Sequence, residues 1–284
     1  MIPILIDGIA YGMLLFVLAS GLAVTLGLMN FINLAHGAFA MAGGYVTSVL
    51  MNSHGVPFLV TLPVAFVVPA LVGAVLERTL YAPLYGRSHL DHVLFSIGLT
   101  FMAVSATTWA MGSQQQLISL PGWLEGRFEL FGIAIGRYRA FLIVVCAALV
   151  VALQLVLTRT RFGSRLRAAV DDRRVARGLG IRVETIFAAT FAVGSGLGGL
   201  GGALGVPMLG LDPTFPLKYM VYFLIVVTIG GTAGLAGPFL AALIIGVADV
   251  AGKYYLPELG SFLITLLMIV LLVLRPQGLI ARAR

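Results

Sequence analysis

The chain has 284 residues, of which 60% are hydrophobic and only 10% are charged. Its mean hydropathy of +1.05 lies far outside the range of soluble globular domains, which excludes such a domain and indicates an integral membrane protein. The net charge of +7 then points to basic cytoplasmic loops rather than to a nucleic-acid partner. The single cysteine, Cys146, excludes a disulfide framework and a thiolate metal cage.

Apolar runs long enough to cross about 30 Å of hydrocarbon recur along the whole chain. They lack the alternation of membrane β-strands, so the expected fold class is an all-α polytopic membrane protein. We predict about nine transmembrane helices (eight to ten), some broken by Gly or Pro: residues 3–28, 32–52, 57–80, 93–112, 140–157, 186–206, 219–233, 236–252 and 259–275. No polar stretch is long enough for a soluble domain, so residues 1–284 are expected to form one transmembrane domain.

The distribution of basic residues in the short loops predicts how the chain is oriented. The arginine-rich loop 158–184 is expected in the cytoplasm, with residues 77–92 and the tail 275–284. The loop 113–139 is nearly balanced in charge and is expected outside. Nine crossings then place the N-terminus outside and the C-terminus inside.

Glycines are concentrated in three segments, residues 35–44, 193–206 and 229–237. Small residues allow close approach of helix backbones in lipid, so tight helix packing is the first interpretation. The alternative is a set of broken helices that line a substrate path, where irregular backbone faces a cavity.

The sequence lacks the residue patterns of an enzyme or of a self-powered carrier. Ser195 has no nucleophile elbow around it, the histidines form no metal-binding motif, and no phosphate-binding loop is present. We therefore expect no catalytic residue, metal or cofactor in this chain. Carboxylates are mostly near span ends or in loops; the exception is Asp249, which Lys253 one turn later is expected to pair.

The segment RLRAAVDDRRVARGLGI, from Arg165 to Ile181, is by contrast strongly polar. Its spacing predicts a short helix over Arg165–Arg177 that Gly178 and Gly180 terminate, with the paired aspartates bonded to nearby arginines. A solvated surface helix explains the arginines. The alanines, paired acids and glycine break favour a compact helix presented to a partner protein.

These residues resemble a known family. AAVDDRRVARGLGI (168–181) is similar to the coupling loop of ABC importer permeases, and in particular of the branched-chain amino acid permease family of the LivH type. GLMNFINLAHGAFAMAGGY (27–45), VVTIGGTAGLAGPFLAALIIGVAD (226–249) and LLVLRPQGLI (271–280) are similar to three further motifs of that family, in the same order.

The resemblance implies an ATP-driven, binding-protein-dependent importer of the bacterial inner membrane, for branched-chain or other amino acids. The partners would be a second homologous permease, two cytoplasmic ATPase subunits that bind ATP and Mg, and a periplasmic substrate-binding protein. The residues carried over to ATPase coupling are Arg167, Ala168, Ala169, Asp171, Asp172, Ala176, Gly178 and Gly180. Arg167 stands where the classical loop has Glu.

Three polar residues, Asn30, Asn33 and His36, are spaced i, i+3 and i+6 in an apolar run, roughly on one helical face. Such a stripe is costly in lipid unless its groups bond one another or line a cavity. We hold open two roles, bracing a helix break and lining the translocation pathway. The alternative function is a self-contained channel or secondary carrier for a small polar solute such as urea or an amide.

Overall fold

The computed structural model describes residues 1–284 except 30, 32, 131, 232–233, 275–277 and 280–284. The helices are α1 (Ile2–Met29), α2 (His36–His54), α3 (Phe58–Leu76), α4 (His89–Met111), α5 (Arg137–Arg159), α6 (Arg161–Asp171), α7 (Arg173–Gly178), α8 (Val183–Leu209), α9 (Phe215–Gly230), α10 (Ala236–Tyr255) and α11 (Gly260–Leu274). A π-helical turn (Glu77–Tyr81) and a 3-10 turn (Ala82–Leu84) continue α3, and another 3-10 turn (Pro257–Leu259) precedes α11.

Each of the nine predicted apolar segments contains a helix in the described part of the chain. Six of these helices, α1, α3, α4, α5, α8 and α10, are long and apolar enough to cross a membrane. Of the other three, α9 is an apolar helix of 16 residues, the described part of α11 has 15, and α2 carries more polar residues.

The expectation of an all-α fold missed a small hairpin. Strands β1 (Arg127–Leu130) and β2 (Ile133–Gly136) pair in antiparallel fashion within the loop that precedes α5. The loop carries enough alternating apolar residues to close a two-stranded ribbon, and it packs on the start of α1, where Arg139 pairs with Asp7 at 2.8 Å.

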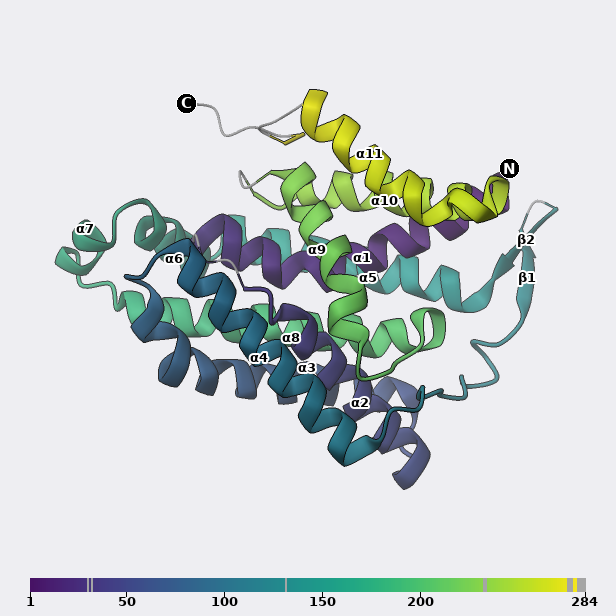
Figure 1. The fold of residues 1–284 in the computed structure, drawn as a ribbon, viewed down its shortest axis with the longest axis horizontal. Coiled ribbons are helices and arrows are strands. Elements are labelled where there is room, and N and C mark those ends of the chain that lie inside the picture. Colours follow the sequence, from purple (N-terminus) through teal and green to yellow (C-terminus); the bar gives the residue numbers. More distant parts are fainter. Residues whose placement is uncertain (30, 32, 131, 232–233, 275–277, 280–284) are drawn as a thin grey trace.

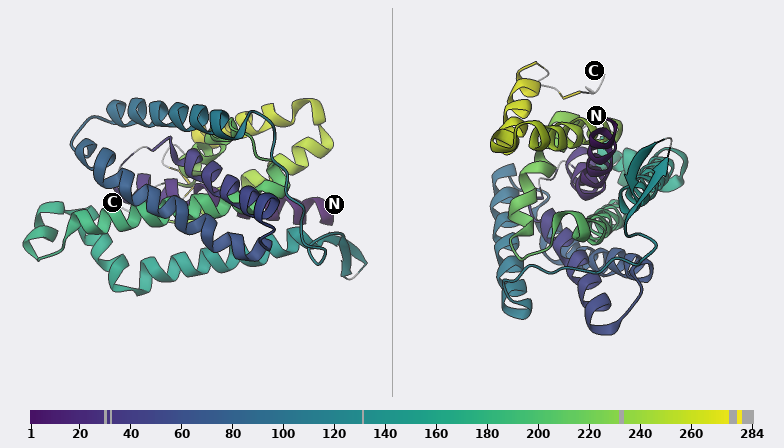
Figure 2. Two further views of the ribbon diagram at one scale, coloured as in Figure 1. Left: turned by 90° about the horizontal axis from the view of Figure 1, so that it is seen from below. Right: turned by 90° about the vertical axis from the view of Figure 1, so that its right-hand side faces the viewer.

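The helices run largely along one long axis, with different features at its two ends (Figure 1). The hairpin and the start of α1 lie at one end, and α6 and α7 project at the other (Figure 1). Figure 2 shows the same separation from a second side. The molecule therefore has a hairpin end and an α6–α7 end.

The glycine-rich segment 193–206 lies within α8, the central helix, which packs against α1, α2 and α3. A Cβ atom at Gly202 would overlap the carbonyl oxygen of Ala40, and one at Gly43 would overlap the backbone of Gly199. These contacts agree with the packing interpretation for this segment, because only glycine allows the backbones to approach so closely.

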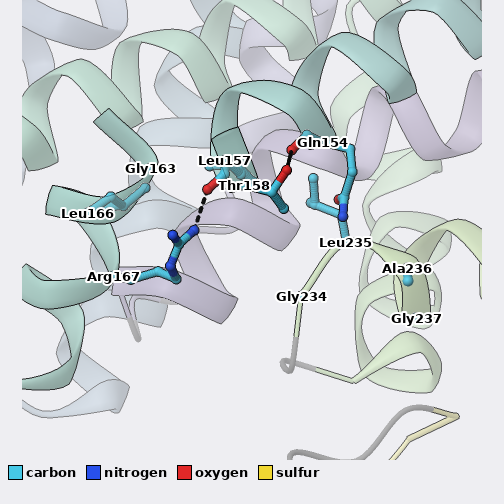
Figure 3. A pocket seen from close by; sticks show the side chains of 10 residues that line it. All are labelled: Gln154, Leu157, Thr158, Gly163, Leu166, Arg167, Gly234, Leu235, Ala236 and Gly237. Carbon is cyan, nitrogen blue, oxygen red and sulfur yellow. Dashed lines mark hydrogen bonds between the residues drawn. The ribbon is translucent and has the colours of Figure 1, made fainter. Parts of the chain in front are cut away.

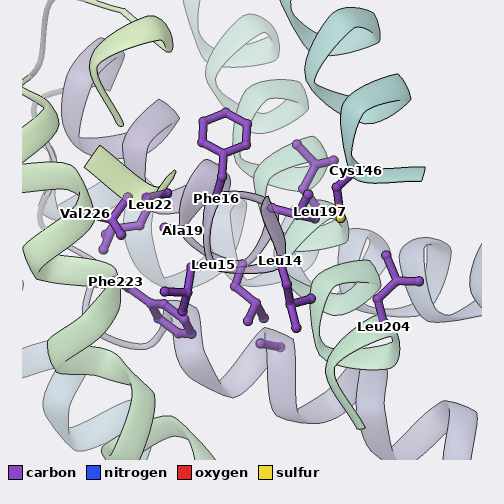
Figure 4. Close-up of a cluster of buried hydrophobic side chains, with 14 of the residues drawn as sticks. Leu14, Leu15, Phe16, Ala19, Leu22, Cys146, Leu197, Leu204, Phe223 and Val226 are labelled. Atoms are coloured by element: carbon purple, nitrogen blue, oxygen red, sulfur yellow. The ribbon is translucent and has the colours of Figure 1, made fainter. Parts of the chain in front are cut away.

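Helix α1 is apolar on all sides because it is buried on nearly all sides. Its middle turns pack against α5, α8 and α9 in the main hydrophobic cluster (Figure 4). The residues labelled there are Leu14, Leu15, Phe16, Ala19, Leu22, Cys146, Leu197, Leu204, Phe223 and Val226. Helix α4 differs, since Met102 and Trp109 are 69% and 90% exposed, so its outer face is left for lipid or another protein.

Candidate functional site

The arginine-rich loop forms two helices, not the single helix that its spacing predicts. Helix α6 ends at Asp171, and Asp172 adopts an extended conformation with φ −149° before α7 begins. The Asp172 carboxylate accepts hydrogen bonds from the backbone N–H groups of Arg174 and Val175, at 2.8 and 3.0 Å. Aspartate is a favoured N-cap, and this capping competes with helix continuation.

The expected side-chain pairing of Asp172 with an arginine is therefore wrong, since in the described residues this carboxylate caps the α7 backbone. The expected helix stop is confirmed at Gly180, which has a φ of +78°. The Ile181 N–H donates to the Ala176 carbonyl at 3.0 Å across this turn, as in a glycine-terminated helix. Gly178 is the last residue of α7.

The predicted coupling residues divide by exposure. Ala169 and Ala176 are buried, Ala168 is half-buried, and Arg167, Asp171, Asp172, Gly178 and Gly180 are exposed. The predicted set thus contains residues that attach the two helices to the protein and residues that face outward.

Helix α6 is attached to the end of α5. Gly163 approaches Leu157 so closely that a Cβ atom would overlap the Leu157 carbonyl, and Arg167 donates to that same carbonyl (Figure 3). The Leu166 and Ala169 side chains of α6 are fully buried. Arg167, which stands where the classical loop has Glu, therefore attaches α6 to α5 although its side chain is exposed.

Helix α7 is attached through Arg173, which sequence analysis did not single out. Its guanidinium lies over the Phe187 ring at 4.7 Å and the Tyr85 ring at 5.5 Å, a cation–π arrangement. The Tyr85 hydroxyl in turn donates to Glu77 at 2.7 Å. No sequence spacing signals this contact, because the three partners come from α7, α8 and the loop after α3.

The outward face of α7 combines cations with two exposed apolar side chains. Val175 and Leu179 are 57% and 74% exposed, and Arg174 and Arg177 lie beside them in the chain. Leu179 directly follows α7, so this end of the helix exposes two apolar side chains next to arginines, a combination that can contact a partner protein. Val175 and Leu179 are not among the residues predicted from the sequence, although their i, i+4 spacing among arginines is a signal that the sequence carries.

The buried face of α6 and α7 continues into the region where α1 ends and α2 begins. Leu166, Ala169 and Ala176 belong to one apolar cluster with Phe31 and Tyr81. This second cluster, completed by Phe39, Val183, Phe187 and Phe191, links the α6–α7 end to the α1–α2 connection through continuous side-chain contact.

The polar residues of that connection do not share one helical face, so this expectation is wrong. Helix α1 ends at Met29 and α2 begins at His36, with Asn33 in the irregular backbone between them. Asn30 lies outside the described residues. The chain breaks here because Asn33 supplies its side-chain oxygen to the Ala35 N–H at 3.1 Å, a local bond that replaces a helical one.

Asn33 and His36 are 1% and 2% exposed, and both are hydrogen-bonded to distant parts of the chain. The Tyr81 hydroxyl donates to Asn33 Oδ1 at 3.0 Å, and His36 Nε2 donates to the Leu18 carbonyl at 2.7 Å. These bonds are those of a braced helix break. A pathway-lining role for either residue stays a prediction.

A second break, between α9 and α10, faces α6 across a cavity of about 280 Å³ (Figure 3). Gln154, Leu157 and Arg167 form one wall, and residues 234–237 form the other. Gly231, at the start of the break, has a φ of +83°. Helix α6 therefore lies beside both the α1–α2 connection and the α9–α10 break.

Comparison with known proteins gives the family. The sequence profile described as branched-chain amino acid transport system, permease component, matches residues 4–272. The chain belongs to this family. No solved structure matches the chain significantly.

Individual relatives agree with this assignment. The high-affinity branched-chain amino acid transport system permease protein BraD of Pseudomonas aeruginosa is 26% identical over 98% of this chain and 95% of its own. LivH of Escherichia coli K12, which has the same description, is 25% identical over 97% of this chain and 94% of its own length. LivM of the same strain is 24% identical over 96% of this chain and 69% of its own. Like these permeases, this family member is a multi-pass membrane protein, and the bacterial inner membrane fits the family.

Proposed function

We propose that this chain is a transmembrane subunit of an ATP-driven, binding-protein-dependent importer of branched-chain or other amino acids. The observation that carries the proposal is the construction of α6 and α7. Their inner face is built into the second apolar cluster, while Val175, Leu179 and the neighbouring arginines remain exposed. A surface of this kind can receive a partner and transmit its movement inward.

The proposed assembly has a second homologous permease, two ATPase subunits and a periplasmic binding protein. Two permeases of Escherichia coli, LivH and LivM, both match this chain along nearly its whole length, which supports pairing of two different permeases. ATP and Mg would be held by the ATPase subunits, and this chain would hydrolyse nothing.

The proposed topology has nine crossings, with the N-terminus outside and the C-terminus inside. The positive-inside rule assigns the α6–α7 end to the cytoplasm, because eight arginines lie within and beside these helices. The hairpin end, which carries both β1–β2 and the start of α1, then lies outside (Figure 1).

In the proposed mechanism, closure of the ATPase subunits moves α6 and α7. The movement passes through the second apolar cluster to the α1–α2 connection and across the cavity to the α9–α10 break. Irregular backbone at membrane depth absorbs such movements more easily than a continuous helix, so these two breaks are the proposed hinges of alternating access.

Genes for the ATPase subunits, the second permease and the binding protein are expected beside this one. The experiment is co-expression with these genes, followed by co-purification and an ATPase assay. We expect Val175→Asp with Leu179→Asp to abolish ATPase co-purification, because charge replaces the exposed apolar contacts. The matched control is Leu117→Asp, since Leu117 is 70% exposed but lies in the loop before the hairpin. Amino-acid uptake that persists without ATPase subunits would overturn the proposal and favour a self-contained channel or carrier.

A further inference from the structure

A polar cavity lies near the hairpin end, among α1, α8, α9 and α10. Its volume is about 400 Å³, and it is lined by Tyr11, Met208, Leu209, Lys218, Tyr219, Tyr222, Asp249, Val250 and Lys253. The hairpin end contains this part of α10, since the Tyr255 hydroxyl at the end of α10 contacts the Met1 sulfur at 3.1 Å. We refer to this space as the Asp249 cavity.

Asp249 is the buried charge of this cavity, with an exposed fraction of only 2%. Its Oδ2 accepts from Lys253 at 2.7 Å, which confirms the pairing expected from the sequence. Its Oδ1 is buried and has no hydrogen-bond partner among the described residues. An unsatisfied carboxylate oxygen in a membrane protein is costly, and intramembrane acids of this kind mark ligand and ion pathways.

The cations of the cavity lie at its more exposed side. The Lys253 and Lys218 side chains are 52% and 56% exposed, and the Lys253 ammonium also lies 5.8 Å from the centre of the Tyr11 ring. Lys218 is already held by Asp212 through an ion pair. Burial raises the pKa of Asp212, but hydrogen bonds from Lys218 and Thr214 outweigh it and leave the pKa below its usual value. Lys253 is also ion-paired, but its partner is Asp249 itself, so it is the cation that lies next to the unsatisfied Asp249 oxygen.

We propose that the Asp249 cavity binds a zwitterionic α-amino acid, an inference that rests on the proposed function and gives it a site. The ammonium of the ligand donates to Asp249 Oδ1. The carboxylate of the ligand accepts a hydrogen bond from Lys253. The Lys253 ammonium has three N–H donors, so it can keep its hydrogen bond to Asp249 Oδ2 at the same time. Met208, Leu209 and Val250 offer apolar contacts for the ligand side chain.

Other ligands of this cavity are disfavoured by its charges. A metal ion would need several oxygen or nitrogen ligands, and no group of three His, Cys, Asp or Glu residues in the described parts of the chain is arranged to hold one. An anion would meet Asp249, and a simple organic cation would leave the Lys253 donors unused. A zwitterion uses both charges.

The test measures equilibrium binding of radiolabelled L-leucine to the full permease complex in nanodiscs, without binding protein. We expect Asp249→Asn to weaken binding about tenfold or more, because a charged hydrogen bond is lost. Asp7→Asn is the matched control: Asp7 is also an ion-paired acid at the hairpin end, but it lies outside the cavity. Unchanged binding by Asp249→Asn, or no saturable leucine binding by the native complex, would overturn the proposal.

Competition on the native complex tests the same site without any risk of misfolding. Leucinamide lacks the carboxylate and 4-methylpentanoate lacks the ammonium, so both are expected to compete less well than leucine. Equal competition by 4-methylpentanoate would overturn the role of Asp249. ATP-driven uptake measured in parallel separates the two proposals. If Asp249→Asn shows both normal leucine uptake and normal leucine binding, only the proposed site is rejected. If the native complex binds leucine but shows no ATP-driven uptake, only the importer function is rejected.

Discussion

At the scale of single residues, the buried polar groups of the α1–α2 connection show how a helix break is kept stable in an apolar setting. Asn33 and His36 are each bonded to a different helix or turn, through Tyr81 and Leu18. Breaking such a bond leaves a polar group without a partner, and the intramembrane bond itself is worth about 0.6 kcal/mol on average. We therefore expect the two side chains to contribute mainly to the geometry of the break.

We expect Asn33→Leu to lower the amount of assembled complex while transport per assembled complex stays normal. The reason is that Leu cannot accept from Tyr81 or Ala35. Tyr81→Phe is the matched variant, because it removes only the donor and is expected to lower the yield less. The yield of assembled complex is measured by fluorescence-detected size-exclusion chromatography, and uptake is measured in proteoliposomes. Uptake divided by yield gives the transport per assembled complex. Full yield with a collapsed ratio would instead assign Asn33 to the pathway.

At the scale of elements, α7 depends on its N-cap because a helix of 6 residues has little stability of its own. Asp172→Ala removes the acceptor for two backbone N–H groups and is expected to cost about 1 kcal/mol. The expected result is weaker binding of the ATPase subunits, measured by co-purification, with normal membrane insertion. Asp172→Asn keeps the cap and should behave like the native chain; equal loss in both variants would point to the charge instead.

The packing of α8 gives a second prediction at this scale. Gly202→Ala places a methyl group against the Ala40 carbonyl, and overpacking of this kind costs about 1–3 kcal/mol. The melting temperature of the purified complex is therefore expected to fall. Gly98→Ala is the control, because a Cβ atom at Gly98 in α4 meets open space. A melting temperature unchanged by Gly202→Ala would contradict the close approach of α8 and α2.

The elements also show what the sequence can predict. Apolar length alone located all nine segments, because hydropathy acts over a whole span and needs no knowledge of neighbours. The break at Asp172 is not predicted, and the break between the first two spans is predicted but with the second helix starting too early, at 32 rather than at His36. Both details depend on one side chain that bonds a local backbone group in place of the helix. The Arg173 contact and the Asp249 cavity join residues far apart in the sequence, so only the fold brings them together.

At the scale of the whole molecule, two specialised ends face opposite directions (Figure 2). The α6–α7 end carries a charged surface that contacts the α1–α2 connection and the α9–α10 break, and the hairpin end carries the Asp249 cavity. This division suits an importer, in which substrate enters at one end and energy is supplied at the other. Such a division requires the α6–α7 end to face the cytoplasm.

Orientation is measurable with single cysteines in a background where Cys146 is replaced by Ala. Cys146 is fully buried, so its removal is expected to leave the surface unchanged. Arg174→Cys lies at the exposed start of α7, and Gly122→Cys lies in the exposed loop before the hairpin. An impermeant thiol reagent should label Arg174→Cys only in inside-out vesicles and Gly122→Cys only in intact spheroplasts, since the positive-inside rule assigns the arginines to the cytoplasm. If both label from the same side, the chain crosses the membrane an even number of times between them, and the nine-crossing topology is rejected.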